Sequence, residues 1–175
     1  NMLKKILIYN SGGGLGDAIQ LFPLILSLKN HFKSGHFYYL GAHENHFLNK
    51  LKDFNVNIKT LDLGLKYFGF RWWHLFKAKS RFFELNLDKF DLIIDLQSKL
   101  RNTLILKRIP SVNFYSSTFN YNFCSLKKDY LSNNNISQKT ILNLEKLLDV
   151  NIKKVDFSLD NLNQIYINEA KKLLP

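Results

Sequence analysis

The sequence predicts an α/β fold with a mainly parallel sheet and helices on both of its faces. Near the amino terminus, an apolar run at 3–9 is followed by a glycine-rich loop and then by apolar residues at helical spacing. Strand-like and helix-like segments alternate along the rest of the chain. A later stretch, 90–96, has a continuous apolar centre, which is typical of a strand buried on both faces of a parallel sheet.

Composition limits the partners and the compartment. The 175 residues favour a single domain, over 2–175. The net charge of +11 indicates an anionic partner, which could be nucleic acid, an acidic membrane surface or a phosphorylated substrate. A lone cysteine, Cys124, excludes an internal disulfide framework and fits a reducing cytoplasm. No apolar run approaches the roughly 18 residues of a transmembrane helix.

The glycine-rich loop links the first strand to the first helix. Its spacing excludes a dinucleotide fingerprint, because the glycine required after Gly12 and Gly14 would fall at Asp17. It also excludes a P-loop, which needs a lysine that the loop lacks. Asp17 stands at the start of the helix, where it is either a cap or a working carboxylate. Pro23 predicts a kink in this helix or a restart with Pro23 in the first turn.

The middle of the chain contains two further strands and an unusual segment. We expect a strand at 36–41, a short helix at 46–51 and a strand at 56–61. Residues 66–83 then carry five cations and eight aromatic rings but no acidic residue. Phe76 and Phe83, seven positions apart, are the best core candidates of this segment. As a whole, the segment favours contact with an anionic amphiphile at a membrane surface.

The last part of the chain continues the alternation. The strand at 90–96 ends at the polar residues 97–101, and such positions face the ligand crevice in open α/β sheets. Ordinary loop capping is the alternative for Asp95 and Gln97. The remaining expected elements are a helix through Leu104 to Arg108, a strand at 112–115, a surface loop at 116–135, a helix at 141–148 that Ser137 could open, and a helix at 161–174.

Two motifs together carry a resemblance to a known family. They are Gly13-Gly14-Leu15-Gly16-Asp17 with Pro23 six residues on, and Phe90-Asp91-Leu92-Ile93-Ile94-Asp95-Leu96-Gln97 with Lys99. At this separation they resemble the amino-terminal half of glycosyltransferase family 9, the lipopolysaccharide heptosyltransferases. Two positions depart from the family pattern. Asn10 and Ser11 stand where a basic residue is usual, and Ser98 follows Gln97 where glycine is common.

The resemblance implies a GT-B arrangement, in which two Rossmann-like domains face each other across a cleft. The second domain holds most of the nucleotide-sugar site, so the chain would be an acceptor-binding half that lacks it and is inactive alone. The implied partners are an ADP-heptose-like donor and an anionic lipid-linked sugar acceptor. The implied location is the cytoplasm, at the inner face of the inner membrane. No other cofactor is implied, and the lack of metal-ligand spacing in the sequence fits a metal-independent reaction.

The resemblance also implies roles for individual residues. Asp17 would be the base of an inverting sugar transfer. The residues expected to bind substrate are Gly13, Gly14, Gly16, Arg71, Gln97, Lys99 and Arg101. For Lys99 and Arg101 a solvated helix start is the alternative. Two other functions remain open: a nucleotide-binding module, which the glycine spacing disfavours, and a non-enzymatic basic α/β module for nucleic acid or another anionic partner.

Overall fold

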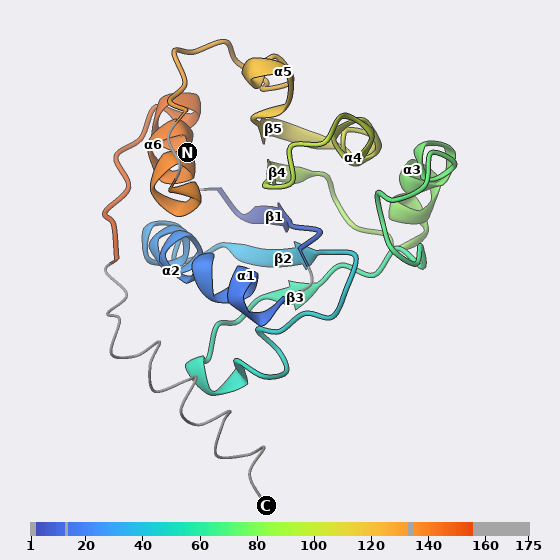
Figure 1. The fold of residues 1–175 in the computed structure, drawn as a ribbon, viewed down its shortest axis with the longest axis horizontal. Helices are drawn as coiled ribbons and strands as arrows, with labels where there is room; N and C mark the ends of the chain where they lie inside the picture. Colours follow the sequence, from blue (N-terminus) through green and yellow to red (C-terminus); the bar gives the residue numbers. More distant parts are fainter. Residues whose placement is uncertain (1–2, 13, 133–134, 156–175) are drawn as a thin grey trace, which may run out of the picture.

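A computed structural model describes residues 3–12, 14–132 and 135–155 (Figure 1). The strands are β1 (Lys5–Tyr9), β2 (His36–Leu40), β3 (Lys59–Thr60), β4 (Phe90–Asp95) and β5 (Ser111–Ser116). The helices are α1 (Leu15–Gln20), α2 (Phe22–His31), α3 (His74–Glu84), α4 (Leu100–Leu106), α5 (Thr118–Tyr121) and α6 (Ile136–Leu148), with a short 3₁₀ turn, η1 (Lys52–Phe54). The helix expected at 161–174 lies outside the described residues.

The described residues form a five-stranded sheet, parallel throughout, in the order β3-β2-β1-β4-β5. The chain builds it outward from β1 in one direction and then from β4 in the other. The order therefore reverses between β1 and β4, and ligands of open α/β sheets bind beyond the carboxyl ends of the strands at such a switch point. The predicted Rossmann-like architecture is confirmed.

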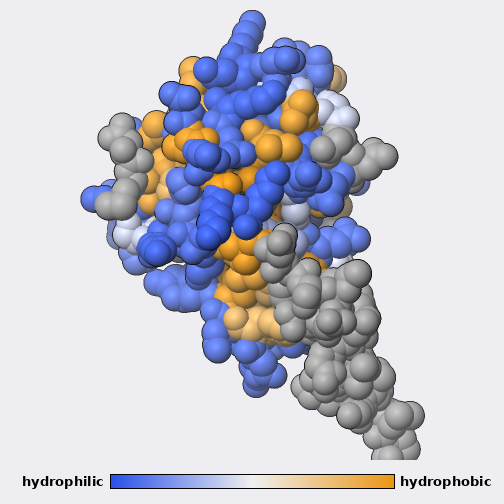
Figure 2. Space-filling view, turned by 90° about the vertical axis from the view of Figure 1, so that its left-hand side faces the viewer, coloured by the Kyte–Doolittle hydropathy of each residue, from blue (hydrophilic) through white to orange (hydrophobic). Residues whose placement is uncertain are grey.

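Helices cover both faces of the sheet, with α1, α2 and α6 on one face and α3 and α4 on the other (Figure 1). Successive residues of β1 point to opposite faces, so Ile8 joins one core and Leu7 joins the other. Figure 2 shows the side on which α2 and α6 lie, where hydrophobic residues reach the surface in patches between hydrophilic ones.

The helix after the glycine loop restarts, as the proline predicts. α1 ends at Gln20 and α2 begins at Phe22, with Pro23 in its first turn. At that position the missing N–H of proline costs the helix no hydrogen bond. The restart makes α1 a separate short element that stays beside the glycine loop.

Residues 46–51 form a series of turns that ends in η1, so the prediction of a helix there is wrong. The amide of Asn45 accounts for the turn. It accepts from the backbone N–H of Phe47 and donates to Thr60 Oγ1 at 3.1 Å, which fixes the chain in a bend rather than a helix. The third strand is also shorter than expected, because Ile58 bonds back to Val56 and leaves only Lys59–Thr60 in the ladder.

The loop after β5 and the start of α6 also differ from the prediction. The loop contains α5, in which Phe119 and Asn120 have left-handed φ values of 48° and 51°. The cap of α6 is Asn135, whose side chain accepts from the N–H of Gln138 at 2.9 Å. Ser137 lies inside the helix instead, and its hydroxyl donates to the carbonyl of Gln20.

The prediction that Phe76 and Phe83 belong to the core is wrong. They are 78% and 54% exposed, whereas the buried face of α3 consists of His74, Ala78 and Phe82. Residues spaced by four share one side of a helix, and Phe76 lies about 200° around the axis from His74. The rotation of α3 therefore turns these two rings away from the sheet.

Candidate functional site

The carboxyl ends of β1 and β4 bring the two predicted motifs together. Tyr9 and Asp95, the last residues of these strands, are partners in the sheet register. The glycine loop follows Tyr9, and the loop that carries Gln97 and Lys99 follows Asp95. Both loops therefore lie at the switch point of the sheet, which is the edge where the sequence predicts ligand contacts.

Asp17 is exposed on this edge. It is the third residue of α1 after the N-cap, Gly14, and its carboxylate folds back over the loop toward Gly12. A Cβ atom at Gly12 would lie 2.8 Å from Oδ2 of Asp17. Among the described residues, no hydrogen bond or ion pair engages this carboxylate. Its oxygens are thus open to a ligand.

The negative charge of Asp17 affects the pKa of the neighbouring phenol of Tyr39. Burial raises the pKa of the Tyr39 phenol to about 12, and the negative charge of Asp17 adds to the effect. The phenol stays protonated and donates to the carbonyl oxygen of Asn10 at 3.2 Å. The Asn10 side chain in turn accepts from the N–H of Gly12. This chain of contacts holds the start of the glycine loop against β2.

The glycines of this loop are not explained by their backbone conformation. Gly12, Gly14 and Gly16 all lie outside the left-handed region, and Gly13 lies outside the described residues. A Cβ atom at Gly16 would meet nothing within 4 Å. The space in front of Gly16 is therefore open, which fits close approach by another molecule better than a conformational need.

We expect Gly16→Ala to keep the fold and to weaken ligand binding. The substitution reduces the freedom of the unfolded chain, so the free energy of unfolding should rise by about 0.4–1 kcal/mol. A methyl group in the open space should at the same time lower the affinity of any ligand that contacts the loop. Thermal melting and a binding titration of the same variant measure the two effects. A loss of stability would show that the glycine serves the fold.

Asp95 is a structural carboxylate. It is buried, and Oδ1 accepts from the backbone N–H groups of Gln97 and Ser98 while Oδ2 accepts from the hydroxyls of Thr103 and Ser116. The capping interpretation therefore holds for Asp95. The same bonds shape the following loop, in which Ser98 adopts a φ of 57°. This left-handed conformation favours glycine, which gives a physical reason for the glycine that the family motif often has at this position.

The three predicted binding residues after β4 lie in different environments. Gln97 is half-buried, Lys99 is exposed and forms the N-cap of α4, and Arg101 is half-buried. Arg101 donates through Nε to the carbonyl oxygen of Gly69 at 2.8 Å. No bond of its terminal nitrogens to another described residue is seen, so their donors are available to a ligand. No interaction in the structure assigns a ligand to Gln97 or Lys99, so their binding roles stay predictions.

His74 is a buried histidine under the influence of two arginines. Arg71 and Arg101 both lower the pKa of the His74 imidazole, although burial is the larger cause. His74 is fully buried, and its Nδ1 accepts from the N–H of Gly69. Within the described residues, His74 Nε2 and both side-chain polar atoms of the buried Asn102 have no hydrogen-bond partner. The positive charges of Arg71 and Arg101, 30 positions apart in the sequence, thus both act on this buried histidine.

The lowered pKa of His74 predicts that acid destabilises the fold. The unfolded chain takes up a proton as the pH falls below about 6.5, whereas the folded chain resists protonation of this buried ring. We therefore expect a lower denaturant midpoint at pH 5.5 than at pH 7.5. His74→Asn, which keeps an acceptor without a titration, should reduce that difference, whereas His43→Asn at an exposed position should preserve it. An unchanged difference in His74→Asn would contradict this role.

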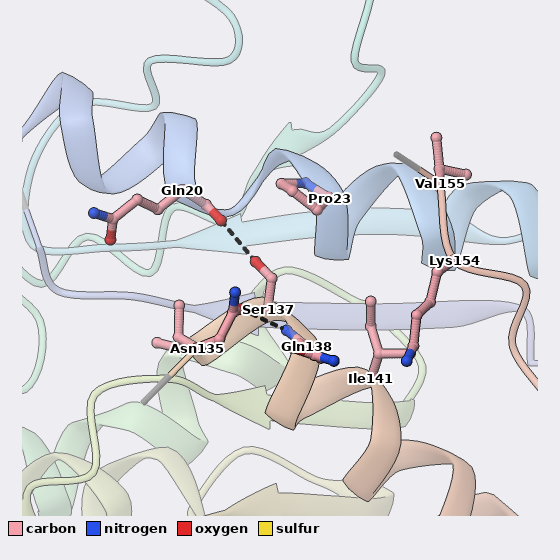
Figure 3. A pocket seen from close by; sticks show the side chains of 9 residues that line it. Gln20, Pro23, Asn135, Ser137, Gln138, Ile141, Lys154 and Val155 are labelled. Carbon is pink, nitrogen blue, oxygen red and sulfur yellow. Dashed lines mark hydrogen bonds between the residues drawn. The ribbon is translucent and has the colours of Figure 1, made fainter. Parts of the chain in front are cut away.

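A pocket of about 570 Å³ lies on the other face of the sheet, between the junction of α1 and α2 and the start of α6. Figure 3 shows Ser137 bonded to the backbone oxygen of Gln20 beside it, with Pro23, Ile141 and Lys154 around the opening. None of the predicted site residues lines this pocket. The sequence could not indicate it, because Gln20 and Ser137 are 117 positions apart.

The described residues contain neither a metal-ligand cluster nor a helix that could cross a membrane. No group of three His, Cys, Asp or Glu side chains there could hold a metal ion. None of the helices in that part of the chain combines the length and the apolar character needed to cross a bilayer.

The sequence matches no protein-family model and no curated protein. The structure does match solved structures. A family 9 glycosyltransferase from Veillonella parvula aligns with 89% of this chain at a TM-score of 0.56 and 18% identity. The E. coli heptosyltransferase WaaC, solved with ADP-2-deoxy-2-fluoro heptose, aligns with 87% of it at a TM-score of 0.58 and 14% identity. WaaC solved with ADP aligns with 87% of this chain at a TM-score of 0.57 and 13% identity. The chain has the fold of the family 9 glycosyltransferases.

The similarity extends over part of each glycosyltransferase. This chain covers 45% of the Veillonella structure and 50% of WaaC, so it spans about half of their length. The family 9 fold thus agrees with the resemblance that the two sequence motifs predict. At these identities the comparison establishes the architecture, and the chemistry rests on the residues described above.

Proposed function

We propose that this chain is the acceptor-binding, amino-terminal half of an inverting family 9 glycosyltransferase and that Asp17 is its catalytic base. The observation that carries the proposal is the exposed Asp17 carboxylate, which no described residue engages, in the loop region after β1 and next to Gly16, whose Cβ position is open. A structural cap would be expected to bond the backbone of its own helix. A base needs an ionised carboxylate within reach of a bound hydroxyl.

The proposed reaction balances without a metal ion. A hydroxyl oxygen of the acceptor forms a bond to the anomeric carbon of the donor sugar as the bond from that carbon to the nucleoside diphosphate breaks. The configuration inverts, and Asp17 takes the hydroxyl proton. The charge of Asp17 would also stabilise positive character that develops on the sugar. The nucleoside diphosphate leaves with the bonding electrons.

The acceptor would bind across the edge of the sheet from Asp17 to the two arginines. Guanidinium groups bind phosphates and sugar carboxylates through paired hydrogen bonds, and the charges of Arg71 and Arg101 both reach His74. Gln97 and Lys99 follow β4 at the same edge and would add contacts. An anionic, lipid-linked saccharide fits this set and the net charge of +11.

The donor would bind mainly outside this chain. The WaaC structures contain ADP and an ADP-heptose analogue, and this chain covers half of WaaC. We therefore propose an ADP-heptose-like donor held by a second domain, with Gly14 and Gly16 close to the transferred sugar. We propose the cytoplasmic face of the inner membrane as the location of this chain.

A transfer assay tests this division of labour. Residues 1–175 alone should give no sugar transfer from ADP-heptose to an anionic acceptor, whereas the same chain completed by a nucleotide-sugar domain should give transfer. Transfer by the isolated chain at ordinary enzyme concentration would contradict the proposal, as would an active completed enzyme whose rate is unaffected by Asp17→Asn.

A further inference from the structure

α3 and the turn before it expose an unusual row of aromatic rings. Four of them are at least half exposed: Trp72 (54%), Trp73 (50%), Phe76 (78%) and Phe83 (54%). We call these four residues the exposed aromatic face. Large exposed apolar patches are uncommon on monomeric proteins and usually mark a contact with a partner or a membrane.

The four rings lie along one side of a continuous helical path. Backbone bonds from His74 to Arg71, from Leu75 to Trp72 and from Phe76 to Trp73 extend the path back beyond the start of α3. Trp72 and Trp73 precede Phe76 by four and three positions, and Phe83 follows it by seven. In a helix such spacings lie on one broad side, and at its margin the half-exposed Trp73 ring also packs edge-on against the His74 ring, with 4.4 Å between the ring centroids.

This side cannot turn inward without unfolding the local core. The opposite side of α3 already buries His74, Ala78 and Phe82. Its rotation is fixed by the bond between Gly69 N–H and His74 Nδ1 and by the bond between Arg101 Nε and the Gly69 carbonyl. The rings are thus held outward by the contacts of Gly69 with His74 and with Arg101.

Exposed cations flank the exposed aromatic face. Lys66, Arg71, Lys77 and Lys79 are all exposed, and no acidic residue occurs between 66 and 83. Arg81 also lies on α3 and pairs with Glu84 at 3.6 Å. An interfacial helix of this kind inserts its rings below the headgroups and leaves its cations at the level of anionic lipid phosphates.

We propose that the exposed aromatic face docks this protein onto an anionic lipid bilayer. The cations around the exposed aromatic face favour an anionic lipid surface over a neutral apolar partner. The convex shape of a helix decides against single-stranded nucleic acid, which binds rings that line a basic groove. Docking there would place Arg71, the residue before Trp72, at the lipid surface. The proposal goes beyond the proposed function and does not require sugar transfer.

The two tryptophans of the chain provide a local probe, because both belong to the exposed aromatic face. Vesicles of phosphatidylglycerol and phosphatidylcholine in equal parts should shift the tryptophan emission to shorter wavelength, whereas pure phosphatidylcholine should shift it much less. Salt should weaken the binding, since exposed charges are screened over about 8–10 Å at physiological ionic strength.

Substitutions with matched controls test the location. Phe76→Ser combined with Phe83→Ser should lower the affinity for anionic vesicles at least about tenfold, because each ring buries a large apolar area. Phe119→Ser removes a similarly exposed ring (59%) on α5 and should leave the affinity unchanged. Lys77→Gln with Lys79→Gln should weaken binding, whereas Lys127→Gln with Lys128→Gln should have a smaller effect.

Three results would overturn the proposal. The first is no binding of the wild-type chain to anionic vesicles, or equal binding to both kinds of vesicle. The second is wild-type affinity in the double phenylalanine variant, with circular dichroism confirming its fold. The third is that the exposed aromatic face instead supports a dimer in sedimentation or binds an oligonucleotide, with vesicle binding unaffected by the same variants. Sugar transfer from a soluble acceptor would survive each of these results.

Discussion

Asp17→Asn should lower the turnover of sugar transfer by roughly 100- to 10,000-fold in the completed enzyme, the usual contribution of a general base. The asparagine keeps the size and the polarity of the side chain but cannot take the acceptor proton. Because no described residue engages the carboxylate, the free energy of unfolding should change by no more than about 1 kcal/mol, the scale of a helix-end charge. Initial rates at saturating substrate and thermal melts measure the two quantities.

Asp53→Asn is the matched control for this substitution. Asp53 is also an exposed carboxylate in the first turn of a helical element, but it lies in η1. Asp53→Asn should leave turnover within a factor of about two of the wild-type value, since surface changes away from a site have small effects. If Asp17→Asn instead kept more than about a tenth of the rate and lost stability, Asp17 would be a cap and the base would have to be sought elsewhere.

Gly69→Ala should produce the largest loss of stability among the glycine substitutions. Gly69 has a φ of 88°, and a Cβ atom there would lie 2.4 Å from the Tyr9 hydroxyl, which donates to the carbonyl of Phe68. The strained backbone alone costs about 1–3 kcal/mol. The clash with the fully buried Tyr9 adds to that cost, because the interior has little space in which to relax.

Gly64→Ala separates the two contributions to this loss. Gly64 also has a positive φ, of 66°, but a Cβ atom there would approach only Arg81 Nη1, at 3.9 Å. Gly64→Ala should lower the free energy of unfolding by about 1 kcal/mol, the penalty of the left-handed conformation alone. Urea denaturation of both variants gives the difference. Equal losses would show that the contact between Gly69 and Tyr9 does not hold the loop before α3.

The glycine loop and the two central strands, β1 and β4, were predictable because local patterns specify them. The apolar run before Ser11, the helical spacing after Asp17 and the position of Pro23 each predict an element that the structure contains. The buried centre of 90–96 likewise predicts a parallel central strand, and β4 pairs with strands on both sides.

The rotation of α3 could not be predicted in this way. Both sides of the helix carry aromatic residues, so the apolar period fits Phe76 and Phe83 as well as it fits Phe82. The choice is made by long-range contacts of Gly69 with Tyr9 and with Arg101, which are 60 and 32 positions away. One of these contacts holds Arg101 against the carbonyl of Gly69, two positions before Arg71, which no spacing in the sequence indicates.

Binding of an anionic saccharide to residues 1–175 tests the central claim most directly. Calorimetric titration with a soluble oligosaccharide that carries phosphates and sugar carboxylates should show saturable binding. Arg71→Gln and Arg101→Gln should each weaken it at least about tenfold, which is 1.4 kcal/mol, while Arg81→Gln and Asp17→Asn should leave it nearly unchanged. A single-stranded oligonucleotide of equal charge should bind more weakly. Absence of saccharide binding, or tighter binding of the oligonucleotide that the same arginine substitutions abolish, would contradict the assignment of this chain as an acceptor-binding half.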